Sequence, residues 1–141
     1  ILLYICGNFA TGRFTTRVGI NWMMLIGSIL ALIGITLAAA LFYAGLNHPL
    51  SLFGPAILVG LGNGLTLPNA NAGLISVRPD LAGTASGLGG ALQMGGGGLL
   101  AIAGGAFLTP LSGPYPLLAV MFLSSIVALV ANIGLLRLPR P

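Results

Sequence analysis

The sequence predicts an all-α integral membrane protein with four full transmembrane helices and part of a fifth. Charged residues make up only 4% of the 141 residues, and hydrophobic residues make up 57%. A soluble domain carries about a quarter charged residues to face water, so this chain is suited to contact with lipid. The third observation is that all five basic residues are arginines that fall between the apolar runs. A single cysteine excludes a disulfide framework.

The four full helices are predicted from apolar runs that contain no Asp, Glu, Lys or Arg. Each such residue at a helix centre costs about 2.5–3.5 kcal/mol on insertion scales. The runs are 21–45, 50–77, 81–108 and 115–136. The apolar stretch 1–10 is shorter than the roughly 20 residues that a crossing needs, and we expect it to be the end of a truncated transmembrane helix.

The arginines predict which connections share a membrane surface. Connections alternate between the two surfaces, and cationic residues gather on the cytoplasmic one. The sequence predicts that all arginines lie on that surface, in a loop at 11–20, in the turn between the second and third full helices, and in a tail at 137–141. They are Arg13, Arg17, Arg78, Arg137 and Arg140. The C-terminus is therefore expected in the cytoplasm.

The four runs differ in polarity, which predicts different surroundings. Runs 21–45 and 115–136 hold few polar atoms and are expected to face lipid. In run 81–108, small residues recur every four positions on one face, at Gly83, Gly87, Ala91 and Gly95. Rows of small residues let membrane helices approach closely, so we expect this helix to be buried and these residues to carry the packing and gating contacts.

Run 50–77 is rich in amides and contains Pro68, which cannot donate a hydrogen bond to the Gly64 carbonyl and should bend or loosen the helix. Polar groups at membrane depth are tolerated only beside protein or a watery cavity. We interpret this run as a cavity-lining or gating helix; the alternative is that the asparagines are packing contacts between helices. The candidate cavity residues are Asn63, Thr66, Asn69 and Asn71, with Gln93 from run 81–108.

Two segments resemble the major facilitator superfamily. The stretch 12–19, GRFTTRVG, is similar to the cytoplasmic loop signature of that superfamily through Gly12, Arg13, Arg17 and Gly19. Thr16 stands where the first copy of the signature usually has Asp, which favours the degenerate copy after the eighth span. The stretch 60–93 resembles the tenth and eleventh spans of Bcr/CflA-type multidrug efflux transporters, particularly at 68–70 and 82–86.

The resemblance implies that the chain is the C-terminal part of a twelve-helix fold, from the end of span eight to span twelve. It further implies an antiporter of the bacterial inner membrane that exports small-molecule drugs by proton-coupled alternating access. Such export would confer antibiotic resistance. The lone acid, Asp80, lies in a turn rather than at membrane depth. Proton coupling, with substrate and protons as partners, is therefore expected to depend on an N-terminal part outside this sequence.

Other functional classes are disfavoured by the residues that they would need. The lone His48 belongs to a turn, and no nucleophile with a base in reach is evident, so we do not expect an enzyme. One each of Cys, His and Asp cannot form a metal centre, no cofactor is predicted, and the scattered arginines do not favour nucleic-acid binding. Two alternatives remain: a self-contained four-helix membrane protein with a structural or assembly role, and a major facilitator transporter of sugars or metabolites. The oligomeric state is left open.

Overall fold

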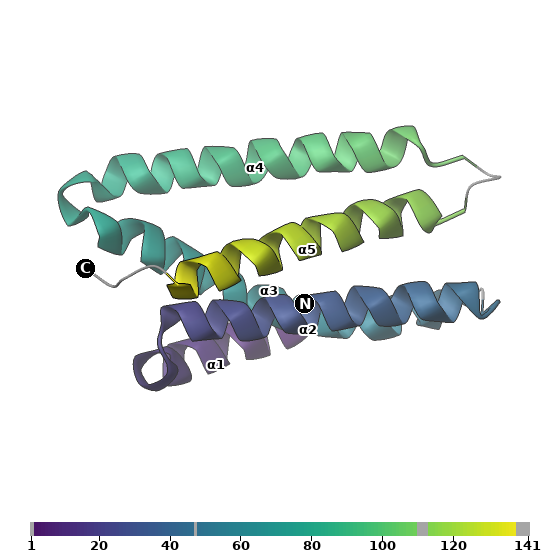
Figure 1. Ribbon diagram of the computed structural model, residues 1–141, viewed down its shortest axis with the longest axis horizontal. Helices are drawn as coiled ribbons and strands as arrows, with labels where there is room; N and C mark the ends of the chain where they lie inside the picture. Colours follow the sequence, from purple (N-terminus) through teal and green to yellow (C-terminus); the bar gives the residue numbers. More distant parts are fainter. Residues whose placement is uncertain (1, 47, 110–112, 138–141) are drawn as a thin grey trace.

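The computed structural model describes residues 2–46, 48–109 and 113–137. Five α-helices and one short 3-10 turn account for the regular structure of these residues, so the all-α fold class is confirmed. The helices lie roughly along one axis and alternate in direction (Figure 1). They are α1 (Leu2–Val18), α2 (Ile20–Tyr43), α3 (Pro49–Val77), α4 (Ala82–Ala106) and α5 (Tyr115–Arg137), with the turn η1 (Pro79–Leu81) before α4.

Three of these helices, α2, α3 and α5, are long and apolar enough to cross a membrane. They correspond to the predicted runs 21–45, 50–77 and 115–136. The fourth predicted span, 81–108, does form a helix, α4, but α4 is not among the three. Its glycines, including the run Gly95–Gly98, supply length without the apolar side chains that a strongly hydrophobic span carries. The structure therefore supports three spans by length and composition.

Helix α1 extends through most of the segment that the sequence predicted as a loop at 11–20. It ends only at Val18, and the single residue Gly19 separates it from α2. Gly19 has φ 93° and ψ 149°, a backbone conformation that is essentially restricted to glycine. The sequence predicts a cytoplasmic loop here, but Arg13 and Arg17 lie on an exposed side of a continuous helix. Of the predicted tail, Arg137 ends α5, and 138–141 lie outside the described residues.

Helix α3 lies against both α1 and α2, and glycines bring the backbones into contact. A Cβ on Gly64 would lie 2.5 Å from the Tyr4 carbonyl oxygen and 2.9 Å from the Gly7 Cα of α1. A Cβ on Gly62 would lie 2.9 Å from the Ala31 nitrogen of α2 and still closer to the Gly27 carbonyl oxygen. Because these approaches leave no room for a side chain, α3 is the element around which α1 and α2 assemble.

The distribution of burial differs from the prediction for two helices. Helix α2, expected to face lipid, contributes the most buried residues, among them Met23, Ile35 and Ala38. Helix α4, expected to be buried, has only Gly104 buried, and every residue from 90 to 103 is exposed. It approaches α3 in its first third, where Gly89 lies against Leu74, and α5 near its C-terminal end, at Gly104.

The predicted packing row on α4 has no neighbour within the described part of the chain. Nothing lies within 4 Å of a Cβ built on Gly83, Gly87 or Gly95, and Ala91 is exposed. The prediction treated regularly spaced small residues as a sign of burial. In this chain the close backbone approaches use the glycines of α1, α2 and α3 instead.

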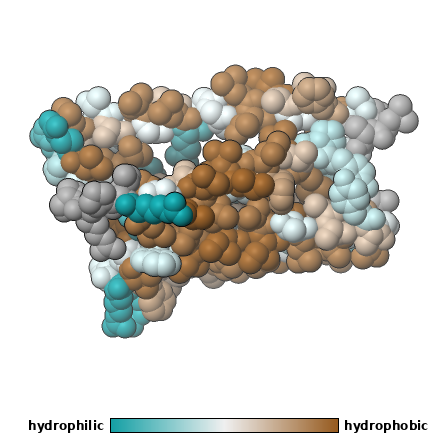
Figure 2. All heavy atoms as spheres, in the orientation of Figure 1, coloured by the Kyte–Doolittle hydropathy of each residue, from teal (hydrophilic) through white to brown (hydrophobic). Residues whose placement is uncertain are grey.

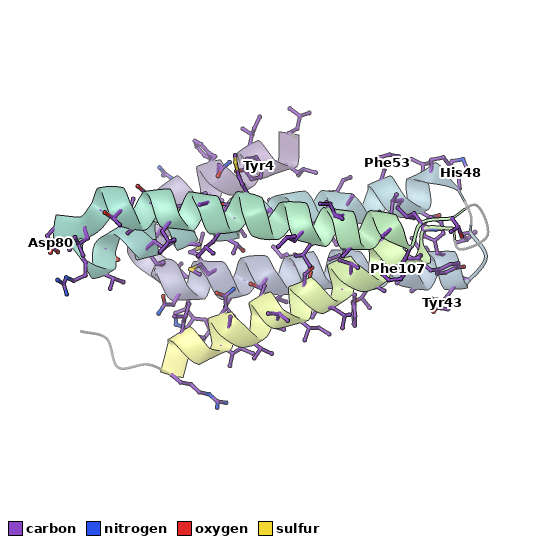
Figure 3. The ribbon with its side chains drawn as sticks, turned by 90° about the horizontal axis from the view of Figure 1, so that it is seen from above. Tyr4, Tyr43, His48, Phe53, Asp80 and Phe107 are labelled. Carbon is purple, nitrogen blue, oxygen red and sulfur yellow. The ribbon has the colours of Figure 1, made fainter. Side chains whose placement is uncertain are left out.

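The two ends of the bundle differ in polarity, in agreement with the predicted segregation of arginines. The α1–α2 turn, the α3–α4 turn and the end of α5 lie together at one end (Figure 1). Arg17 lies in the last turn of α1 and Arg137 ends α5, while Arg78 precedes η1. Strongly hydrophilic spheres gather at this end, and the middle of the same face is mainly hydrophobic (Figure 2). The opposite end holds Tyr43, His48 and Phe107 (Figure 3).

The backbone at Gly19 makes a direct prediction about the motif at 12–19. Gly19→Ala should lower the free energy of unfolding by about 1–3 kcal/mol, because a Cβ strains the backbone at this positive φ. Gly12→Ala is the matched control, since a Cβ at Gly12 meets nothing within 4 Å and Ala is the better helix former. Reversible unfolding in mixed detergent micelles measures both. Equal stability of the two variants would contradict the assigned conformation.

Candidate functional site

A buried polar cluster joins α1 to α3. Asn69 of α3 is 1% exposed, which makes it the most buried large side chain of the described residues. Its Nδ2 donates to the Leu65 carbonyl oxygen at 2.7 Å and approaches Thr11 Oγ1 at 3.4 Å. Its Oδ1 accepts a hydrogen bond from Thr15 Oγ1 at 2.9 Å. Both threonines belong to α1, so this amide connects the two helices. We call Thr11, Thr15, Asn69 and the Gly64 carbonyl the α1–α3 polar cluster.

The same cluster replaces the backbone hydrogen bond that proline removes from α3. Pro68 has no N–H to donate to the carbonyl of Gly64, four residues earlier. Thr11 Oγ1 donates to that carbonyl oxygen instead, at 3.1 Å and in a buried position. A buried carbonyl without a donor would cost about 1–3 kcal/mol. The Gly64 carbonyl, which has no backbone donor because of Pro68, is therefore satisfied by a hydroxyl on another helix.

A second polar cluster joins α2 to α5 on the other side of the core. Asn132 of α5 donates from Nδ2 to Ser28 Oγ, and Ser28 Oγ donates in turn to the Met24 carbonyl oxygen at 2.8 Å. Asn132 and Ser28 are both buried. Thr66 of α3 lies beside this group, with Oγ1 donating to the Gly62 carbonyl at 2.9 Å and lying 3.5 Å from the Met24 carbonyl. Three helices thus converge on one backbone carbonyl.

The remaining candidate cavity residues lie on the outside of the described chain. Asn63, Asn71 and Gln93 are exposed and make no hydrogen bond among the described residues. Asn63 and Gln93 lie close to the midpoints of α3 and α4. The structure therefore divides the five predicted residues into two groups. Asn69 and Thr66 are helix contacts, and the other three amides point outwards, so the described residues do not enclose one cavity with all five.

An open groove of about 410 Å³ lies between the first turns of α1 and the first half of α3. None of the predicted cavity residues lines it. Tyr4 and Phe53 lie at its walls (Figure 3), and its lining is otherwise apolar. Such a surface suits a hydrocarbon chain rather than a polar ligand.

The ion pair and the histidine lie at the two ends of the bundle. Arg78 Nε lies 3.4 Å from Asp80 Oδ1 in an exposed ion pair. His48 caps α3, where Nδ1 accepts a hydrogen bond from the Leu50 N–H at 3.2 Å. At the His48 end, the rings of Tyr43 and Tyr115 lie 5.4 Å apart. No group of three His, Cys, Asp or Glu side chains forms among the residues described. Among the described residues, the buried side chains that can form hydrogen bonds are uncharged.

Sequence reasoning missed four residues of the two clusters. Thr11 and Thr15 lie in the segment predicted as a loop, and Ser28 and Asn132 lie in runs predicted to face lipid. An isolated polar side chain inside an otherwise apolar span is a signal for a partner on a neighbouring helix, and that signal was present at Ser28 and Asn132. Of the loop motif, Arg13, Arg17 and Gly12 are exposed on α1, and Gly19 is the α1–α2 junction.

No protein-family model matches this chain, and comparisons with curated proteins and with solved structures gave no match either. The resemblance to the major facilitator superfamily remains a prediction from the motifs at 12–19 and 60–93.

The buried position of Asn69 predicts a stability difference between two asparagines of the same helix. Asn69→Ala should lower the free energy of unfolding by about 1–2 kcal/mol, since it removes hydrogen bonds to two threonines of α1 and leaves a small cavity. Asn63→Ala is the control, because Asn63 is exposed and has no partner among the described residues. Unfolding in mixed micelles compares the two. A larger loss for Asn63→Ala would contradict the cluster.

Proposed function

We propose that this chain forms part of a secondary active transporter of the major facilitator type, in which α3 and α4 present a polar face to a central substrate cavity. The proposed activity is proton-coupled efflux of small-molecule drugs by alternating access, in a bacterial inner membrane with the arginine-bearing end in the cytoplasm. The coupling acid belongs to a part of the transporter that is not in this sequence, because Asp80 is exposed and paired with Arg78.

One observation carries this proposal: three amides that have no hydrogen-bond partner among the described residues are exposed on α3 and α4. They are Asn63, Asn71 and Gln93. At membrane depth an unpaired amide is tolerated only beside water or another protein surface. Because both Asn63 and Gln93 lie near the midpoints of their helices, moving them to the headgroup region would displace half of each helix from the membrane. A water-filled substrate cavity satisfies these amides and gives them a function.

The side chains of Asn63, Asn71 and Gln93 are uncharged amides, which determines the kind of solute that they can bind. Amides both donate and accept hydrogen bonds without carrying charge. Exposed amides such as Asn63, Asn71 and Gln93 therefore suit uncharged or amphipathic solutes that offer donors and acceptors, which is the class expected for drug efflux. Sugars and small metabolites also offer such groups, and transport of these compounds is the nearest alternative within the same proposal.

The open faces of α4 favour a second candidate function, assembly of a structural membrane complex. Nothing lies within 4 Å of a Cβ on Gly83, Gly87 or Gly95, and rows of small residues on membrane helices support close association. In a transporter these glycines would face the other half of the protein. In an assembly subunit they would face a second copy of the chain. The two functions differ in whether the exposed amides contact water.

Water access to the exposed amides tests the proposal. In the complete transporter with Cys6 replaced by Ser, Asn63→Cys should react with a membrane-impermeant thiol reagent, and the reaction should block drug export. Val127→Cys is the matched control, because Val127 is 68% exposed on α5 and is expected to face lipid. It should be unreactive and should leave export unchanged.

Three outcomes separate the alternatives. Reaction at Asn63→Cys with loss of export supports the substrate cavity. No reaction at this position, together with crosslinking between copies through Gly87→Cys, contradicts the transporter and favours the assembly role. Reaction with undiminished export of drugs and blocked uptake or export of a sugar favours the metabolite transporter. Gly87→Leu provides a further comparison, since it should abolish export only if another part of the transporter packs against α4.

A further inference from the structure

The backbone of α3 is completed at Pro68 by a side chain from a different helix. In an unbroken α-helix, each interior carbonyl accepts a hydrogen bond from the N–H four residues later. At Gly64 that N–H is missing because the fourth residue on is Pro68. The substitute donor is Thr11 Oγ1 of α1, 3.1 Å from the Gly64 carbonyl oxygen. The continuity of α3 at this point therefore depends on the position of α1.

Two features place the Thr11 hydroxyl at this carbonyl. Gly7 of α1 and Gly64 of α3 are in backbone contact, since a Cβ on Gly7 would lie 2.9 Å from the Gly64 Cα. Thr11 is one helical turn after Gly7, so its side chain projects from the same face of α1. The hydroxyl is then oriented by Asn69, whose Nδ2 approaches Thr11 Oγ1 at 3.4 Å and so favours donation towards Gly64. Thr15 Oγ1 donates a hydrogen bond to Oδ1 of the same Asn69 amide.

Helix α1 has a short connection to the rest of the bundle and few buried residues. A single residue, Gly19, connects it to α2. Its buried residues are Gly7 and Thr11, both of which face α3. A tilt of α1 about Gly19 would therefore separate Thr11 from Gly64 without unpacking a large apolar surface. Proline-interrupted helices bend where the ladder of backbone hydrogen bonds is broken.

We propose that the Thr11–Gly64 hydrogen bond is a conformational clasp: it completes the hydrogen bonding of the α3 backbone at Pro68 while α1 is docked, and α3 bends further at Pro68 when α1 moves away. The clasp couples the position of one helix to the shape of its neighbour. It does not depend on the transport activity proposed above, because it is a property of the α1–α3 contact. In any membrane protein built on this bundle, it would link events at the arginine-bearing end of α1 to the middle of α3.

The test measures the shape of α3 directly with spin labels on either side of Pro68. Phe53 and Val77 are 66% and 75% exposed on α3, and both can be replaced by labelled Cys in a Cys6→Ser background. The chain with Thr11 intact should give one narrow distance distribution. Thr11→Val should add a population at shorter distance, because α3 bends further when the Gly64 carbonyl loses its donor. Thr11→Ser keeps the hydroxyl and should restore the single distance.

A matched control removes a threonine hydroxyl that has no partner on another helix. Thr36 Oγ1 donates to the Leu32 carbonyl of its own helix, α2, so Thr36→Val should leave the distance unchanged. The clasp is overturned if Thr11→Val gives the same distribution as Thr36→Val, or if Thr11→Ser behaves like Thr11→Val.

Restoring the backbone donor provides a decisive second comparison. Pro68→Ala returns an N–H that can reach the Gly64 carbonyl, so the Thr11 hydroxyl is no longer needed there. The clasp predicts that Thr11→Val has no effect on the distance distribution in the Pro68→Ala background. If Thr11→Val alone fails to fold, recovery of the fold in the double variant supports the clasp. Equal failure of the single and double variants overturns it.

Discussion

The close approach of α3 to its two neighbours is the constraint on which the rest of the structure depends. Gly62 faces α2 and Gly64 faces α1, and neither position has room for a Cβ. Lipid tails are as apolar as leucine side chains, so burial of apolar surface does not drive membrane helices together as it does in water. Dispersion contacts and interhelical hydrogen bonds must do so instead. Both require backbones at short distance, which the glycines allow.

The polar clusters follow from this geometry. With the α1 and α3 backbones in contact, short side chains such as Thr11 reach across to backbone carbonyls. With α2 held against α3, Thr66 and Ser28 are brought to the same region as the amide of Asn132. Every buried side-chain nitrogen and oxygen atom of the described residues has a hydrogen-bond partner. The exposed amides of α3 and α4 differ, because they have no such partner among the described residues and need water or another protein surface in the membrane.

Much of the architecture could be predicted from the sequence because it depends on local signals. Long uncharged runs predicted the helices, and the arginines predicted which ends lie together, since both patterns reflect the environment of each segment rather than its neighbours. The loop predicted at 11–20 differs from the helical segment observed, because Thr11 and Thr15 are stabilised in α1 by partners more than fifty positions away in α3. No local signal contains that information.

Which glycines contact a neighbouring helix also could not be predicted from one helix at a time. The row at Gly83, Gly87, Ala91 and Gly95 is the more regular pattern, yet it is exposed, whereas the irregular glycines of α1 to α3 make the contacts. Regular spacing shows that a helix can accept a close neighbour, and it does not identify that neighbour. The site residues divide for the same reason: Asn69 and Asn63 are the same residue type on one helix, and only the position of α1 makes one buried and the other exposed.

A pair of alanine substitutions tests the central role of this close approach most directly. Gly62→Ala should lower the free energy of unfolding by about 1–3 kcal/mol, because the added methyl group forces α2 and α3 apart. Gly97→Ala on the open face of α4 meets nothing within 4 Å and should raise it by up to about 1 kcal/mol, since alanine is the better helix former. Opposite signs in reversible micelle unfolding are the predicted result. A stabilising effect of Gly62→Ala equal to that of Gly97→Ala would contradict the account.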